Sequence, residues 1–99
     1  MPEQWPTPEQ AYANAPSILS EIDWLSRTLY TTPCLAPLGW EYYLRKAAVL
    51  DRIALAAPDD DTTTDARAAC AFLLDMDPPT AICDPRHYVR QQYALATHR

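Results

Sequence analysis

Ten prolines and a single glycine constrain the fold of this chain more than any other feature of its sequence. Proline is tolerated in the first turn of an α-helix but is excluded from helix interiors, because its ring clashes with the preceding turn and it has no backbone N–H to donate. The prolines therefore mark helix boundaries along the 99 residues. Ala occurs sixteen times and β-branched residues other than Thr are few, so the segments between the prolines favour helices over strands.

Apolar spacing and capping signals predict a helix in each of these segments. In the segment that follows Pro16, apolar residues recur at helical spacing, namely Ile18, Ile22, Leu25 and Leu29. We expect this stripe to face the core. The same reasoning gives an apolar stripe to each of the later segments. We expect four long helices and one short N-terminal helix, at residues 16–30, 38–57, 65–76, 85–97 and 8–13.

Three helix starts carry specific capping signals. Thr7 with Gln10, and Thr62 with Asp65, have the spacing of a capping box, and Asp84 precedes a proline at the first helical position. Connections of roughly 6–8 residues between such helices are typical of antiparallel neighbours. We therefore predict an all-α fold, a compact antiparallel bundle of four helices in a single domain over residues 1–99.

The overall charge and the hydropathy of the chain limit its partners. A net charge of −5 and a pI near 4.7 argue against a dedicated nucleic-acid binder, because phosphate neutralisation supplies most of that affinity. No segment approaches the roughly 20 apolar residues that cross a bilayer, and the N-terminus lacks the features of a signal peptide. We expect a cytoplasmic protein without a membrane partner. Arg outnumbers Lys seven to one, which together with the Ala content suggests an actinobacterial origin.

Side chains that could support catalysis or metal binding are present, but their spacing is not that of known sites. The acidic run Asp59–Asp61 lacks the Gly and Glu of an EF-hand loop, so we interpret it as a solvated helix N-terminus. Cys83 and His87 lack the paired spacing of zinc ligands, and Cys70 lies on a core stripe. The cysteines are expected as thiols. We predict no enzymatic activity, no metal, no cofactor and no small-molecule substrate.

Aromatic and apolar residues away from the core stripes are the more informative feature. Trp24 points away from the stripe of its helix, and Tyr42, Val49 and Ile53 form a second apolar line with Lys46 between them. Two interpretations stay open. Either these residues are covered within the bundle, Trp24 by the N-terminal segment, or they form an exposed patch for a partner.

The last predicted helix carries Arg86 and Arg90 one turn apart, on a face that could bind an acidic segment or contact phosphate. Two arginines on a helix more often form an ordinary solvated face. Our leading hypothesis is a non-enzymatic helical protein–protein interaction module, either a homodimer or the small partner of a larger protein. We predict partner contacts at Trp24, Tyr42, Lys46, Val49, Ile53, Arg86 and Arg90. One alternative is a transcription-related or nucleic-acid-associated regulator that uses the last helix. A second is a metal- or thiol-dependent protein centred on Cys83 and His87.

Overall fold

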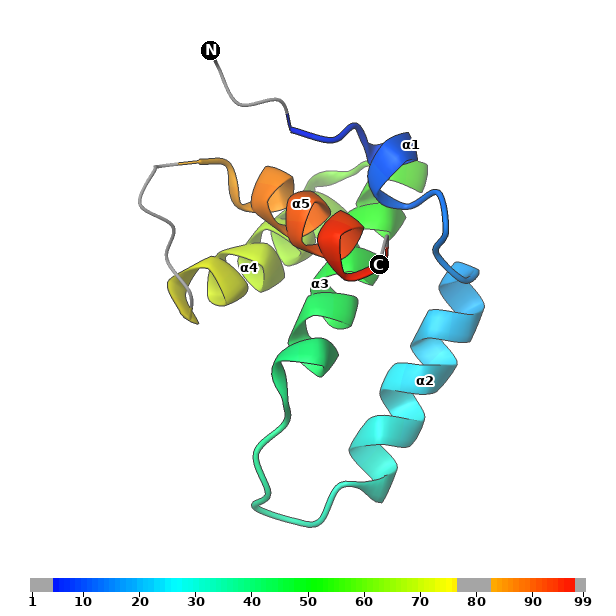
Figure 1. Ribbon diagram of the computed structural model, residues 1–99, viewed down its shortest axis with the longest axis vertical. Helices are drawn as coiled ribbons and strands as arrows, with labels where there is room; N and C mark the ends of the chain where they lie inside the picture. Colours follow the sequence, from blue (N-terminus) through cyan, green and yellow to red (C-terminus); the bar gives the residue numbers. More distant parts are fainter. Residues whose placement is uncertain (1–4, 77–82, 98–99) are drawn as a thin grey trace.

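The computed structural model of the chain describes residues 5–76 and 83–97, and within these residues it contains five helices and no strand. The helices are α1 (Pro8–Ala11), α2 (Ile18–Thr31), α3 (Trp40–Ala56), α4 (Asp60–Met76) and α5 (Pro85–Thr97). The four long helices pack into one small bundle (Figure 1), so the predicted all-α fold is confirmed. Their bounds agree with the expected ranges within about two residues, apart from the start of α4.

The expected caps account for two helix starts. Thr7 and Gln10 form a complete capping box at the start of α1, and the Asp84 side chain accepts a hydrogen bond from the backbone N–H of Arg86 at 2.8 Å. The start of α4 differs from the prediction. Here Asp59 and Thr62 satisfy each other's backbone N–H groups, at 2.8 Å and 3.1 Å. Because this reciprocal cap precedes the expected one at Thr62 and Asp65, α4 begins five residues earlier, at Asp60 rather than Asp65.

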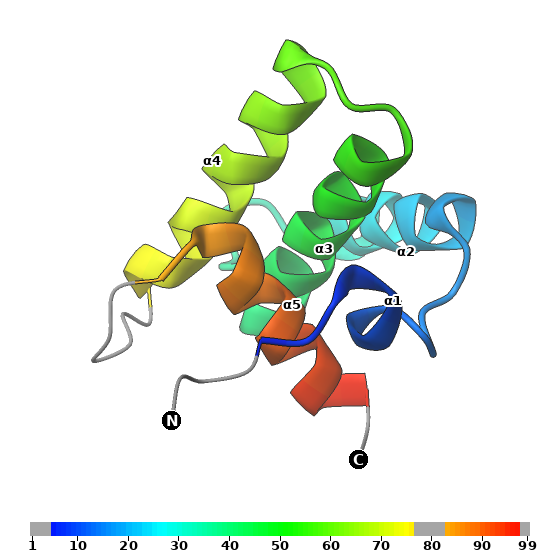
Figure 2. The ribbon, with the colours of Figure 1, turned by 90° about the horizontal axis from the view of Figure 1, so that it is seen from above.

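Helix α3 is the central element of the bundle. It contacts α2, α4 and α5, while the short α1 rests on α5. Figure 2 shows α3 and α4 side by side, with α5 lying across them and α2 on the other side of α3. The core between α3, α4 and α5 consists mainly of small and aromatic side chains, namely Leu44, Ala47, Ala48, Cys70, Leu73, Tyr88, Val89 and Tyr93.

The orientation of α2 differs from the prediction. The structure buries Glu21, whereas two members of the expected stripe, Ile22 and Leu29, are exposed. The other two members, Ile18 and Leu25, are half-buried. The helix is therefore rotated about its axis so that a charged residue faces α3 and part of its apolar side faces solvent.

None of the described helices is both long enough and apolar enough to cross a membrane.

Candidate interaction surface

A buried ion pair holds α2 against α3. The Glu21 carboxylate on α2 forms a bidentate contact with the Arg45 guanidinium on α3, through Nε and Nη2. The same guanidinium lies 3.6 Å from the centroid of the Trp24 ring, which is cation–π distance. The Arg45 guanidinium therefore lies between the Glu21 carboxylate and the Trp24 ring, both of which belong to α2. These two contacts fix the rotation of α2 about its axis.

A second buried cluster is centred on Asp51 and joins α3 to α5 and to the end of α1. The fully buried Asp51 carboxylate accepts hydrogen bonds from Arg90 Nε and Nη2 at 2.8 Å and 2.9 Å. It also accepts bonds from Arg86 Nε and from the Tyr12 hydroxyl, each at 2.5 Å. With every acceptor direction occupied, the carboxylate is a structural centre rather than a free group.

The electrostatics of this cluster favour the charged state of Asp51. Burial alone would raise the pKa of its carboxyl, but hydrogen bonds from Arg90, Tyr12 and Arg86 outweigh that effect and hold the pKa below its ordinary value. Burial and the neighbouring Asp51 charge raise the pKa of the Tyr12 hydroxyl well above its usual range. Tyr12 therefore stays protonated and continues to donate its hydrogen bond.

The predicted arginine face of the last helix is occupied by this cluster. Arg86 and Arg90 both bind Asp51, and the Arg90 side chain is only 10% exposed. A guanidinium that already shares a buried carboxylate is not available to a phosphate without breaking that contact. The geometry thus gives no support to nucleic-acid binding through these two residues.

The predicted second apolar line is largely inside the bundle. Tyr42 and Val49 are 7% and 3% exposed, Ile53 is half-buried, and of these residues only Lys46 is exposed. Trp24 is half-buried under Arg45 and stacks on Tyr42, with ring centroids 6.5 Å apart. Of the two interpretations left open by the sequence, coverage describes this line better. The side chains seen against Trp24 in the described part of the chain, Arg45 and Tyr42, belong to α3, whereas Trp5 and Tyr12 of the N-terminal segment lie against rings of α5.

Four of the nine exposed large apolar residues in the described part of the chain lie instead on the solvent side of α2. Leu19, Ile22, Leu29 and Tyr30 lie on one side of this helix at helical spacing and are 79%, 40%, 52% and 91% exposed. We call these four residues the α2 outer face. Figure 1 shows α2 at the edge of the molecule, where it packs mainly against α3, and the Tyr93 hydroxyl of α5 donates a hydrogen bond to Glu21 at 3.5 Å. Several exposed apolar side chains on one side of a helix are the kind of surface that interaction sites use.

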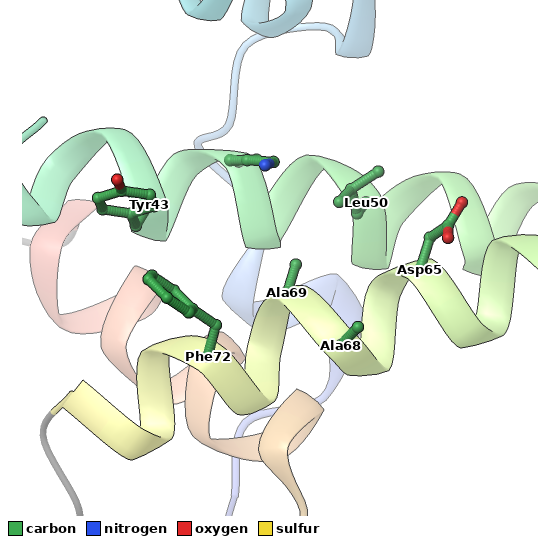
Figure 3. Close-up of a pocket in the computed structure, with 7 residues that line it drawn as sticks. Tyr43, Leu50, Asp65, Ala68, Ala69 and Phe72 are labelled. Atoms are coloured by element: carbon green, nitrogen blue, oxygen red, sulfur yellow. The ribbon is translucent and has the colours of Figure 1, made fainter. Parts of the chain in front are cut away.

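A second surface feature lies between α3 and α4. It is an open groove of about 490 Å³ lined by Tyr43, Lys46, Leu50, Asp65, Ala68, Ala69 and Phe72. Figure 3 shows the Tyr43 and Phe72 rings at one end, small side chains of α4 along the middle, and Asp65 at the other end. Lys46 is the one predicted contact residue that lines this groove.

The cysteines and His87 differ in burial: Cys34 and His87 are exposed, Cys83 is half-buried and Cys70 is buried. No cluster of three or more potential metal ligands occurs among residues 5–76 and 83–97. All three cysteines belong to the described part of the chain, and none forms a disulfide. Burial raises the pKa of the Cys70 thiol to about 12, so this thiol stays protonated at neutral pH. His87 is exposed and lies near Trp5, with ring centroids 6.2 Å apart.

By fold the chain is a small all-α bundle, and four of the exposed large apolar residues in its described part lie on one helix at its edge. Comparisons with protein-family models, with curated proteins and with solved structures found no match.

Sequence reasoning did not identify the α2 outer face. The apolar spacing predicts two of its members, Ile22 and Leu29, in the core, but both are exposed. A signal was present, since Leu19 and Tyr30 lie on the same side of the helix as these two residues and widen the apolar arc well beyond one narrow stripe. An arc this wide on a helix at the edge of a bundle leaves part of its apolar surface uncovered.

Proposed function

We propose that the chain is a cytoplasmic, non-enzymatic helical interaction module that binds a helix of a protein partner through the α2 outer face. One observation carries the proposal: α2 buries its charged residue Glu21 and presents Leu19, Ile22, Leu29 and Tyr30 to solvent. This orientation leaves apolar surface in water that a partner helix can cover. Covering a fully exposed Leu or Tyr side chain contributes about 1.5–3 kcal/mol before the costs of association.

The size of the surface suits a single partner helix. With 14 residues, α2 is about 21 Å long, and its apolar residues occur at the spacing that amphipathic helices use to pack against each other. The two buried carboxylates do not compete with this role, because each is already paired with guanidinium groups inside the bundle. Their function is to hold α2 and α5 in place.

Site-specific photocrosslinking in cells that produce the protein tests this proposal. Benzoylphenylalanine replaces Tyr30 on the α2 outer face, or Arg67 on the exposed side of α4 as the matched control. Mass spectrometry then identifies the crosslinked species. We expect a defined protein adduct from position 30 and none from position 67. The proposal fails if position 30 yields no adduct, or if both positions capture the same mixture of abundant proteins.

A further inference from the structure

The flank of the α2 outer face carries one acidic and one basic residue. Asp23 and Arg27 are both exposed and form an ion pair at 2.6 Å along the same side of the helix. In an isolated helix such a pair, four residues apart, contributes only a few tenths of a kcal/mol. It also places opposite charges beside an apolar surface. At a helix–helix contact, charges in that position select the partner and its direction.

The apolar residues of the face are arranged nearly symmetrically along the helix. Leu19 and Tyr30 lie at almost equal distances before and after Leu25, and so do Ile22 and Leu29. An identical helix running in the opposite direction would therefore set the apolar residues of one copy against those of the other. Ser26, the exposed small residue near the midpoint, leaves room for the two backbones to approach.

The charged residues have the same symmetry. Asp23 and Arg27 stand two residues before and two residues after Leu25. When two identical helices pack antiparallel, like flanks face each other, so Asp23 of one copy lies opposite Arg27 of the second copy, and the reverse. A parallel pair would instead turn this flank toward the side of α2 that carries Ile18 and Leu25, which are already half-buried in their own chain.

From this arrangement we infer that the partner of the α2 outer face is a second copy of the same chain. The two α2 helices pack antiparallel about a two-fold axis near Leu25, with two Asp23–Arg27 ion pairs between the copies. The inference rests on the proposed role of the α2 outer face and specifies its partner. A contact through one helix of this length buries less than the roughly 800 Å² per partner of standard interfaces, so the dimer is expected to dissociate in the micromolar range.

Charge exchange between the two positions tests the inference. Sedimentation equilibrium from about 10 µM to 1 mM measures the dimer dissociation constant of the wild type, Asp23→Arg, Arg27→Asp and the double variant. Each single variant places two pairs of like charges across the interface and should raise the Kd by about tenfold. The double variant restores opposite charges and should return the Kd to within about threefold of the wild-type value. Arg67→Asp, on the exposed side of α4, is the matched charge control and should leave it unchanged.

The outcomes separate this inference from the proposed function. A wild-type chain that stays monomeric at 1 mM, or single variants that associate as strongly as the wild type, would overturn the antiparallel dimer. A double variant that remains as weak as the single variants would also overturn it, because only a self-complementary contact is repaired by the exchange. If the dimer fails while photocrosslinking at position 30 still captures a different protein, the proposed function stands with another partner. Circular dichroism of every variant confirms that the helices are intact.

Discussion

Replacing Asp51 with Asn is the most informative perturbation of the fold, because this one carboxylate joins three parts of the chain. Asn keeps the size of the side chain but removes its charge and one of its two acceptor oxygens. Arg90, Arg86 and Tyr12 would then share a single carbonyl oxygen, and the amide N–H₂ group would face donors. The loss of the carboxylate charge destabilises the Arg90 guanidinium most, because its side chain is only 10% exposed and cannot be hydrated instead.

The magnitude follows from removing one partner of a buried ion pair, which costs about 3–5 kcal/mol. Arg86 is more exposed than Arg90 and can turn toward water, so we place the cost of Asp51→Asn near the middle of that range, at about 4 kcal/mol. For a domain of this size the loss corresponds to a fall in Tm of roughly 15–30 °C. Urea denaturation followed by circular dichroism at 222 nm measures the free energy of unfolding directly.

Asp23→Asn is the matched control, since Asp23 also pairs with an arginine but on the exposed side of α2. This change should cost below about 0.5 kcal/mol. If Asp51→Asn leaves too little folded protein for a denaturation curve, Tyr12→Phe removes only one hydrogen bond to the same carboxylate and should cost about 1.5–3 kcal/mol. Values for Asp51→Asn within about 1 kcal/mol of the Asp23→Asn control would refute the structural role of the cluster.

Three further predictions concern the buried groups. Arg45→Met should destabilise the fold by about 3–5 kcal/mol, because the buried Glu21 carboxylate loses its guanidinium and keeps only the hydrogen bond from the Tyr93 hydroxyl. The double variant Glu21→Leu with Arg45→Met should recover most of that loss, as paired urea curves would show. The pKa of Asp51 in the folded protein lies below its value of about 3.9 in the unfolded chain. The charged carboxylate therefore stabilises the fold above about pH 3.9, and this stabilisation is lost as the pH falls through the folded pKa. The free energy of unfolding should fall in acid, and less steeply in Asp51→Asn than in the wild type. With its pKa raised to about 12, Cys70 should react with iodoacetamide at pH 8 only after denaturation, while the exposed Cys34 reacts in the folded protein; equal rates in native buffer would contradict the burial of Cys70.

Helix positions and helix starts are the features that the sequence predicts best, because the residues that determine them, caps and prolines, are close together in the chain. Thr7 and Asp84 cap the helices that their positions indicated, and Pro85 begins α5. The one misplaced start, that of α4, arose because two overlapping pairs have capping spacing, and the structure uses Asp59 with Thr62. Both pairs put an oxygen acceptor three residues before a second polar residue, and the pair that the structure uses has Asp at the cap, which N-caps prefer to Thr.

Core positions can be predicted from the sequence where the apolar stripe of a helix faces several neighbouring helices. Val89 and Tyr93 on α5, and Ala47 on α3, are buried as their spacing predicts. The line through Tyr42 and Val49 is also buried, because α3 is contacted on several sides. For such a helix the apolar arc exceeds half the circumference, and the sequence shows the width of that arc without showing which neighbour covers each part.

The rotation of α2 depends instead on a contact between distant residues. Hydropathy places Glu21 on the outside and Ile22 inside, but a carboxylate that gains two charge-assisted hydrogen bonds from Arg45 can be buried at small net cost. Glu21 and Arg45 are 24 residues apart, so no helical periodicity reports their pairing. Once that pair and the Trp24 ring fix Arg45, geometry turns Leu19 and Tyr30 to solvent. The apolar surface proposed for binding is therefore a consequence of the buried ion pair. Glu21, which is buried, thus determines which side of α2 faces solvent.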